Sequence, residues 1–364
     1  MSAACAKFLW ESLPTVLSCG MGSGTSSTRL LERGVLKDRV RAFVDGRSSE
    51  GFEELILDVH AFQKSANPAY AAFCAASPNA THWTEIPAVP QQAFKTTELR
   101  SFPEDETQRI FHTSGTTGEG VGRHFFRDLD LYQTVALAGW KAARLPDKVD
   151  IALLPHPSEV PHSSLSQMAA WLADPSAFLV RDGALDAAAL ARLIGEANNP
   201  IVVFGTALAF LHAIETATPG SLTLPPGSRV VETGGYKGSG REVPRGELYR
   251  LFTEHFGIPP GAIVNEYGMT ELSSQFYSEG PSGAHRGGGW IRARILDPGT
   301  GKDVEDGESG VLQLYDLANI DSVCAVLTRD LATRDGDVFH LLGRDPLAVP
   351  RGCSRAADEM LARS

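Results

Sequence analysis

The chain has 364 residues, of which 43% are hydrophobic and 21% are charged. These values are ordinary for a globular protein, and the length fits one large domain or two unequal ones. The formal net charge of −11 argues against a nucleic acid or an anionic membrane as the main partner. An anionic substrate would therefore have to be held by local hydrogen-bond donors, a cation or a metal.

Cysteine usage and hydropathy exclude further classes of protein. The five cysteines are an odd number without a Cys-x-x-Cys pair, so neither a disulfide framework nor a zinc site is indicated. No apolar run approaches the ~18 residues of a membrane span. Residues 1–10 lack the basic start and long apolar core of a signal peptide. We therefore expect a soluble, cytoplasmic protein.

The sequence changes character along its length and divides into four segments. Residues 1–35 are rich in Ser and Gly and are expected to be weakly ordered. Residues 36–288 alternate apolar runs with amphipathic stretches, which predicts an α/β core. Residues 289–342 are short apolar runs between Asp/Gly turns, which predicts a β-meander or a small barrel. Residues 343–364 are expected to form a hinge remnant and a tail.

Five short apolar runs of the core segment are predicted to be parallel strands, because amphipathic helices separate them. These runs are residues 151–154, 177–180, 201–204, 229–231 and 262–264. Two or three helices are expected between Arg39 and Ala75, and Asp128 is placed to cap a helix that runs to about Leu145. Ligands of such sheets lie beyond the carboxyl ends of the strands.

The first candidate site is a loop rich in Ser, Thr and Gly that follows the apolar pair Ile110-Phe111. The stretch Thr113-Ser-Gly-Thr-Thr-Gly118 lies between Ile110-Phe111 and Phe125-Phe126, which would anchor it between two strands. Glycine lets the backbone approach a phosphate closely, and N–H groups and hydroxyls donate to it. A flexible surface linker is the alternative. The loop lacks the Gly-Lys-Ser/Thr ending of a P-loop. The candidates for phosphate binding are Thr113, Ser114, Gly115, Thr116, Thr117 and Gly118.

A second candidate site, Asn265-Glu-Tyr-Gly-Met-Thr-Glu271, follows the predicted strand at 262–264. The carboxylate of Glu271 is a hard oxygen ligand of the kind that Mg²⁺ prefers. Thr270 is placed to donate to an anion, and Tyr267 to stack on a base. Taken alone, such a turn is more often the start of a helix, because Thr and Glu also fit capping chemistry.

Together the two stretches resemble the signature motifs of the adenylate-forming enzymes: acyl-CoA synthetases, peptide-synthetase adenylation domains and beetle luciferases. Further segments resemble this superfamily in the same order. They are Glu232-Thr-Gly-Gly-Tyr236, Gly307-Glu-Ser-Gly-Val-Leu312, Thr328-Arg-Asp330 and Gly343-Arg-Asp345. The resemblance implies an α/β adenylation domain with parallel βαβ layers and a terminal β-barrel-like subdomain.

The end of the chain resembles one family within this superfamily. Only a short tail follows Asp345, so we expect the mobile C-terminal domain of the superfamily, with its lysine, to be missing. The acyl-protein synthetases of bacterial bioluminescence (long-chain-fatty-acid–luciferin-component ligases) end in the same way. The segments that resemble that family are Thr233-Gly-Gly-Tyr-Lys-Gly238, residues 265–275 and Arg351-Gly-Cys-Ser354. The resemblance spans roughly residues 40–364.

The resemblance implies ATP and Mg²⁺ as cofactors and assigns roles to particular residues. Thr270 would contact the α-phosphate, and Glu271 would bind Mg²⁺. Lys237 is a candidate to replace the missing lysine, an exposed surface lysine being the alternative. The other residues implied to hold the nucleotide, besides the loop Thr113–Gly118, are Gly234, Gly235, Tyr236, Glu266, Tyr267, Gly268, Asp330 and Arg344.

The implied reaction is the activation of a carboxylic acid, fatty or aryl, to acyl-AMP with release of pyrophosphate, followed by transfer to a thiol. Cys353 is the candidate acceptor, because thiolates are good nucleophiles and basic residues flank it. An incidental tail thiol is the alternative reading. A partner reductase or acyltransferase, or CoA, would then receive the acyl group.

Two other functions stay open at this point. One is an acyl-CoA or amide ligase with a small-molecule acceptor, and the other is a degenerate nucleotide-binding scaffold. The acid itself is not identified by the sequence. His156, His162, Ser163 and Ser164 follow the strand at 151–154 and are candidates to line its pocket, an exposed loop being the alternative.

Overall fold

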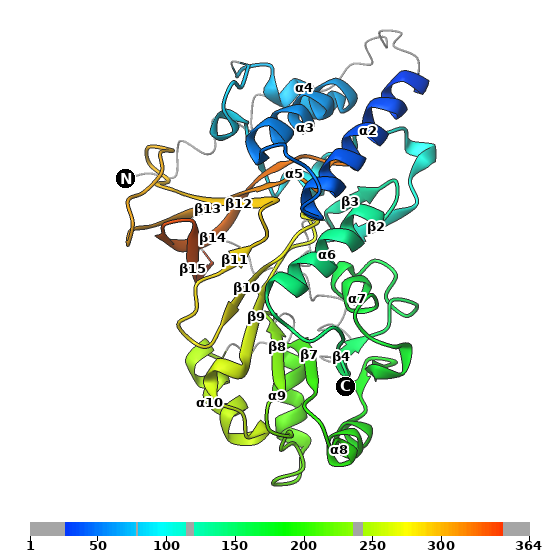
Figure 1. Ribbon diagram of the computed structural model, residues 1–364, viewed down its shortest axis with the longest axis vertical. Helices are drawn as coiled ribbons and strands as arrows, with labels where there is room; N and C mark the ends of the chain where they lie inside the picture. Colours follow the sequence, from blue (N-terminus) through cyan, green and yellow to red (C-terminus); the bar gives the residue numbers. More distant parts are fainter. Residues whose placement is uncertain (1–25, 78, 114–119, 236–242, 345–364) are drawn as a thin grey trace.

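The computed structural model describes residues 26–77, 79–113, 120–235 and 243–344. The molecule is elongated, with a large sheet in one half and a smaller sheet beside the N-terminal helices in the other (Figure 1). The two sheets are linked by backbone pairing of His285 with Phe339, in which the amide of His285 donates to the carbonyl of Phe339 at 2.7 Å. The candidate site lies where the two sheets meet.

The larger sheet has eight strands in the order β11-β10-β9-β8-β7-β4-β5-β6. Its strands are β4 (Ile151–Pro155), β5 (Phe178–Arg181), β6 (Ala184–Leu185), β7 (Val202–Thr206), β8 (Arg229–Thr233), β9 (Ile263–Tyr267), β10 (Phe276–Glu279) and β11 (Arg286–Gly287). Strands β9, β8, β7, β4 and β5 run parallel, which confirms the five predicted parallel strands. Strands β6, β10 and β11 add antiparallel edges that the sequence analysis does not predict.

Helices cover both faces of this sheet because its strands are apolar on both sides. The helices are α6 (Asp130–Ala142), α7 (Ser164–Ala169), α8 (Ala187–Glu196), α9 (Ala207–Thr216) and α10 (Arg245–Phe256). On one face, Val203, Val230 and Ile263 pack with α8, α9 and α10. On the other face, Val231 and Val264 pack with α6 and α7. Alternate residues of each strand therefore face different helices.

The smaller sheet forms the second core together with the N-terminal helices. Its strands are β1 (Val89–Pro90), β12 (Ile291–Leu296), β13 (Ser309–Asp316), β14 (Ala325–Asp335) and β15 (Val338–Arg344). They pair as an antiparallel meander from β12 to β15, with β1 added in parallel on β14. Of the two predicted arrangements, the meander is observed, and the pairing of the described strands does not close into a barrel.

The helices that cover this sheet come from the start of the described chain. They are α2 (Ser26–Val44), α3 (Phe52–Ala66), α4 (Pro68–Cys74) and α5 (Ala93–Thr96). Apolar residues of α3 such as Leu55 and Val59 share one core with Leu314 and Val326 of β13 and β14. Residues on both sides of the predicted boundary at 288 thus build this core together. Helix α2 begins at Ser26 and occupies the end of the segment for which the sequence predicts weak order.

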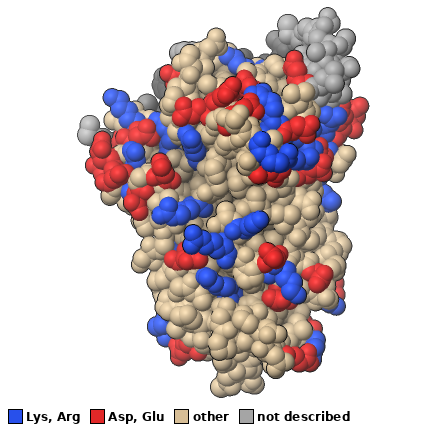
Figure 2. All heavy atoms as spheres, viewed as in Figure 1, with Lys and Arg blue, Asp and Glu red and all other residues tan. Residues whose placement is uncertain are grey.

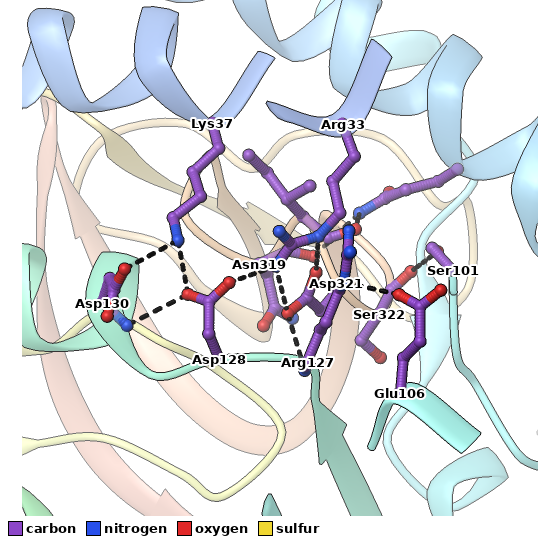
Figure 3. Close-up of polar contacts among 12 residues, drawn as sticks. Arg33, Lys37, Ser101, Glu106, Arg127, Asp128, Asp130, Asn319, Asp321 and Ser322 are labelled. Carbon is purple, nitrogen blue, oxygen red and sulfur yellow. Dashed lines mark hydrogen bonds and ion pairs between the residues drawn. The ribbon is translucent and has the colours of Figure 1, made fainter. Parts of the chain in front are cut away.

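A dense polar cluster fixes α2 to the rest of the molecule (Figure 3). Arg33 of α2 donates from Nε and Nη2 to the two carboxylate oxygens of Asp321, at 2.6 and 2.8 Å, and from Nη2 to Asp128 at 3.1 Å. Lys37 donates to Asp128 and Asp130 at 2.5 and 3.0 Å. Asp321 also accepts from the backbone N–H of Arg127 at 3.0 Å. These contacts join α2 to the start of α6 and to the loop that precedes β14.

A short antiparallel hairpin carries the first candidate loop. Strands β2 (Arg109–His112) and β3 (Arg123–Phe126) pair with each other, and Phe111, Phe125 and Phe126 are buried. This confirms the predicted anchoring of the loop between two aromatic-bearing strands. In the space-filling view, charged side chains of both signs crowd the half of this face that carries α2–α4 and the smaller sheet (Figure 2). None of the described helices has the length and hydropathy needed to cross a bilayer.

Candidate active site

Residues of both sheets meet at the carboxyl end of β9. The hydroxyl of Tyr267, the last residue of β9, donates to Oδ2 of Asp330 on β14 at 2.7 Å, and both side chains are buried. The backbone of Arg344 pairs with Asp330 across β14 and β15. The structure therefore brings three of the predicted nucleotide-binding residues to one place.

The turn that contains Thr270 and Glu271 is held by side chains from distant parts of the chain. His124 of β3 donates from Nδ1 to the carbonyl of Thr270 at 2.6 Å, and Asn319 donates from Nδ2 to the carbonyl of Glu271 at 2.9 Å. The hydroxyl of Thr270 donates to the carbonyl of His112 at 3.4 Å. Both predicted catalytic side chains are buried. Their backbone is thus fixed relative to the hairpin β2–β3.

Ser164, the first residue of α7, reaches the same turn. Its Oγ lies 3.4 Å from Oγ1 of Thr270, and because the Thr270 proton is directed to His112, Ser164 is the donor. Ser163 caps α7 by accepting from the N–H of Ser166 at 3.1 Å. The predicted pocket-lining segment 156–164 therefore does approach the site, through its last residue.

Thr113 closes the base of the candidate phosphate loop. Its N–H donates to the carbonyl of Gly122 at 2.8 Å, and its Oγ1 accepts from the N–H of Gly122 at 2.9 Å. A Cβ at position 122 would lie 2.4 Å from that Oγ1, so only glycine allows this close approach. Ser114, Gly115, Thr116, Thr117 and Gly118 lie outside the described residues. Phosphate binding by this loop stays a prediction.

The glycines after β8 and β9 are also described. Gly235 has a positive φ of 116°, which favours glycine, and its carbonyl accepts from the N–H of Leu208 at 3.3 Å. Gly234 beside it is exposed. A Cβ on Gly268 would lie 2.6 Å from Oε1 of Glu266, so glycine makes room for that carboxylate. Tyr236, Lys237 and Cys353 lie outside the described residues.

Two buried carboxylic acids lie on neighbouring strands near this edge. Burial raises the pKa of Glu266 to about 7, although a hydrogen bond from Thr233 opposes this shift. Burial also raises the pKa of Glu232, against hydrogen bonds from Tyr249 and Asn265, which donate to its Oε1 at 3.0 and 2.6 Å. Carboxylic acids with raised pKa values gather at functional sites more often than elsewhere.

Histidines line the side of the site toward the hairpin. The rings of His112 and His162 stack in parallel with centroids 3.9 Å apart. Burial lowers the pKa of His112, and His162 and Arg123 lower it further. Burial lowers the pKa of His124 to about 4, so near neutral pH its ring is uncharged and donates from Nδ1. The hydrogen-bond network around Thr270 therefore does not depend on a charged histidine.

The donor set of the site fits Mg²⁺ that arrives with a nucleotide. Glu271 supplies a carboxylate beside Thr270, and hard oxygen ligands suit this ion. In the part of the chain that the structure describes, no three His, Cys, Asp or Glu side chains surround a common point. An ion held here would complete its coordination with phosphate oxygens and water, as Mg²⁺ commonly does.

Sequence reasoning missed the residues that hold the turn in place. His124 is separated from Thr270 by 146 positions, and Asn319 from Glu271 by 48 positions. Each supports a backbone carbonyl, and no local pattern marks a side chain for that role. His124 follows the candidate loop closely, and the aromatic pair Phe125-Phe126 directly after it is the one signal that pointed to a buried strand.

Comparison with known sequences agrees with this geometry. Residues 47–315 match the family described as AMP-binding enzyme. The long-chain-fatty-acid–luciferin-component ligase of Vibrio harveyi is 24% identical over 300 residues, which cover 74% of this chain and 76% of that protein. The predicted resemblance to adenylate-forming enzymes is therefore confirmed, and the similarity to the bioluminescence ligases is real but distant.

One solved structure has the same fold over most of this chain, and another matches less well. An open conformation of 2-hydroxyisobutyryl-CoA ligase, in complex with 2-HIB-AMP and CoA, matches with a TM-score of 0.62 at 16% identity, over 82% of this chain and 76% of that one. ATP-bound MatB from Rhodopseudomonas palustris matches with a TM-score of 0.47 at 17% identity, over 67% of this chain, which spans 49% of that protein. The match over residues 47–315 covers most of the sequence. This chain belongs to the AMP-binding enzyme family.

Proposed function

We propose that this protein activates a carboxylic acid with ATP to give acyl-AMP and pyrophosphate, and then transfers the acyl group to a thiol. The observation that carries the proposal is that Tyr267 contacts Asp330 at the end of β9, while Thr270, three residues later and next to Glu271, contacts the carbonyl of His112 beside Thr113. Membership of the AMP-binding family and the names of the similar ligases support it. A fatty or an aryl acid is the proposed substrate.

In the first step a carboxylate oxygen of the acid attacks the α-phosphorus, and the bond to pyrophosphate breaks. Positioning and charge neutralisation account for catalysis of this kind. The Thr270 hydroxyl, which otherwise donates to the carbonyl of His112, would donate to the α-phosphate when the nucleotide binds. Asp330, together with Tyr267, accepts hydrogen bonds from the ribose hydroxyls. Glu271 would hold Mg²⁺, which would supply positive charge to the phosphates. The buried positions of Thr270 and Glu271 keep water away from the mixed anhydride.

In the second step a thiolate attacks the acyl carbon and AMP leaves. We propose Cys353 as the acceptor, from which a partner reductase or acyltransferase takes the acyl group. Its basic neighbours Arg351 and Arg355 favour the thiolate. Lys237 is proposed to supply positive charge near the phosphates.

ATP–pyrophosphate exchange over a panel of fatty, aryl and amino acids tests the first step. We expect Mg²⁺-dependent exchange with at least one acid. If the folded protein shows neither exchange nor affinity for ATP with Mg²⁺, the proposal is wrong. A non-catalytic scaffold is then the remaining function. Lys237→Ala tests the accessory charge, because an unchanged rate of acyl-AMP formation would leave only an exposed lysine.

The second step is tested by incubating wild type and Cys353→Ser with ATP, Mg²⁺ and the labelled acid. We expect hydroxylamine-sensitive label on the wild type and none on the variant. Equal labelling of both proteins excludes Cys353. Label on neither, with acyl-AMP still formed, points to CoA or an amine as the acceptor.

A further inference from the structure

A row of polar side chains crosses the larger sheet on the face toward α6 and α7. Thr233 of β8 is the register partner of Glu266 on β9, and Glu266 is the register partner of Tyr277 on β10. Residues directly opposite one another on neighbouring strands have Cβ atoms ~5 Å apart on the same face. This places a hydroxyl, a carboxyl and a phenol side by side at the carboxyl end of the parallel strands.

Two members of the row have hydrogen-bonding capacity to spare. The hydroxyl of Tyr277 is buried and has no hydrogen-bond partner among the described residues. No ion pair of the described residues involves Glu266, and the groups that act on its carboxyl are Thr233 and Glu232, neither of them a cation. A buried polar group without a partner costs ~1–3 kcal/mol, so a ligand that supplies the partner regains this free energy.

The row is surrounded by apolar groups and connected to the reacting end of the site. Tyr277 belongs to the same core as Trp140 and Phe204, and its ring packs edge-on against Trp140 at 6.3 Å. The hydroxyl of Tyr132 donates to the carbonyl of Ser164 at 3.0 Å, and Ser164 in turn contacts Thr270. Tyr132 is also close enough to Tyr277 to influence its hydroxyl. The row is thus continuous with Thr270, beside which the carboxylate of the acid must lie.

Access to Glu266 from the site is provided by Gly268. Oε1 of Glu266 lies so close to the Gly268 backbone that a Cβ there would be 2.6 Å away, and Gly268 itself is half-buried. The carboxyl group is therefore directly beneath the turn that carries Thr270 and Glu271. A substituent on the acid can reach it without crossing the sheet.

The opposite face of the same strands provides the contrast. There Glu232 and Asn265 form a second polar row, in which Asn265 and Tyr249 both donate to Glu232, and Asn265 Oδ1 lies 2.7 Å from His285 Nε2. The Glu232 carboxylate is thus satisfied by two donors from this row, although Nδ1 of His285 has no hydrogen-bond partner among the described residues. Glu266, by contrast, has Thr233 as its one side-chain donor among the described residues, and the Tyr277 hydroxyl has no partner among them.

We propose that Glu266 and Tyr277 form the substrate-selecting end of the acyl site and bind a hydrogen-bond donor carried by the acid. The inference rests on the proposed function and narrows it: the substrate is a hydroxy- or amino-substituted carboxylic acid, not an unsubstituted fatty or aryl acid. A hydroxyl or amino group donates to the Glu266 carboxyl and accepts from or donates to the phenol of Tyr277. The remaining apolar lining contacts the carbon skeleton.

The test is ATP–pyrophosphate exchange with pairs of acids that differ by one group: octanoate with 2-hydroxy-, 8-hydroxy-, 2-amino- and 8-aminooctanoate, and 3-phenylpropanoate with its 4-hydroxy, 4-amino and 2-amino derivatives. We expect wild type to favour a substituted acid over its parent by ~10-fold or more in kcat/KM, because a site built for a donor rejects analogues that lack it. The substituent that gives the higher kcat/KM, hydroxyl or amino, identifies the donor group of the substrate.

Glu266→Gln and Tyr277→Phe should each lower this preference several-fold by reducing kcat/KM of the substituted acid more than that of its parent. Tyr249→Phe is the matched control, because it removes a hydroxyl from the opposite face and should leave the ratio between paired acids unchanged. The inference is overturned if wild type exchanges both members of every pair equally well. It is also overturned if neither variant alters the kcat/KM ratio between paired acids. In both cases the proposed function stands. Absence of exchange with every acid overturns both.

Discussion

The buried carboxylate of Glu271 is expected to be the most sensitive position of the site. Glu271→Gln keeps the side chain's size but removes the charge that would hold Mg²⁺. We expect acyl-AMP formation to fall by ~10²-fold or more, which corresponds to ~3 kcal/mol of transition-state stabilisation. Exchange kinetics at saturating Mg²⁺ measure the effect. Glu254→Gln on the exposed side of α10 is the control, and an equal rate in both variants would remove Glu271 from the metal site.

Glu266 is expected to make the folded state less stable as the pH rises. Its pKa is raised from 4.5 to about 7 in the folded protein, so between these values the folded state binds more protons than the unfolded state. The free energy of unfolding should therefore fall across this range, by at most ~3 kcal/mol from this group. Denaturant unfolding of wild type and Glu266→Gln at pH 4.5 and pH 8 measures it.

The variant should gain stability relative to wild type at the higher pH, because glutamine cannot be ionised. Glu254→Gln again serves as the control, since its side chain is exposed. A stability difference between Glu266→Gln and wild type that is the same at both pH values would show that the carboxyl titrates normally in the folded protein.

For single residues, a sequence motif predicts which side chains carry the chemistry better than it predicts which side chains hold them in place. Tyr267 and Asp330 are in contact, and Thr270 and Glu271 are buried in the turn just after Tyr267; their roles at the site stay predictions. The supporting contacts of His124 could not be predicted, since they join positions that only the folded chain brings together. The motif also did not predict that the Thr113 hydroxyl accepts a hydrogen bond from the N–H of Gly122 and so closes the base of the loop.

Helix α2 illustrates how an element can depend on a few buried charges. Arg33 is largely buried between Asp321 and Asp128, and removing one partner of such a pair leaves an uncompensated buried charge. Arg33→Met is expected to lower the free energy of unfolding by ~3 kcal/mol. Denaturant unfolding measures this change. The exposed ion pair of Arg192 with Glu196 is the control, and Arg192→Met should cost less than ~1 kcal/mol.

The double variant Arg33→Met/Asp321→Asn separates charge from packing. If the unpaired Asp321 carboxylate causes the loss, the double variant should be more stable than the sum of the two single changes. Additive losses would mean that the packing of the arginine stem, and not the buried charge, holds α2 in place.

Strands were predicted where the sequence alone determines burial. The five parallel strands are short apolar runs buried on both faces, so their residues identify them without knowledge of a partner. Strand β11 is an edge strand, β10 lies between it and β9, and β1 has two residues. Each of the three exists because a neighbouring strand offers hydrogen bonds. Helix α6 ends at Ala142, short of the predicted Leu145, and Arg144 just beyond it has a positive φ of 55°.

At the scale of the whole molecule, the candidate site belongs to neither sheet alone. Glu271 and Tyr267 come from the larger sheet, while Asp330 comes from the smaller one, and Asn319 links them through the loop before β14. The order of segments in the sequence does not reveal this arrangement, because residues 36–99 pack on the strands after residue 290. One hydrophobic core therefore contains residues from both sides of the predicted division at residue 288.

That packing has a consequence for how the protein is made. Helices α2–α4 leave the ribosome well before the strands that complete their core, a delay on the order of tens of seconds at ordinary translation rates. During this interval residues such as Phe52, Leu55 and Val59 have an apolar face with no partner, while the larger sheet can already assemble. The nascent chain thus carries an exposed hydrophobic surface of the kind that chaperones bind, and emergence of strands β12–β15, not emergence of the helices, sets the moment at which the N-terminal part can complete its core.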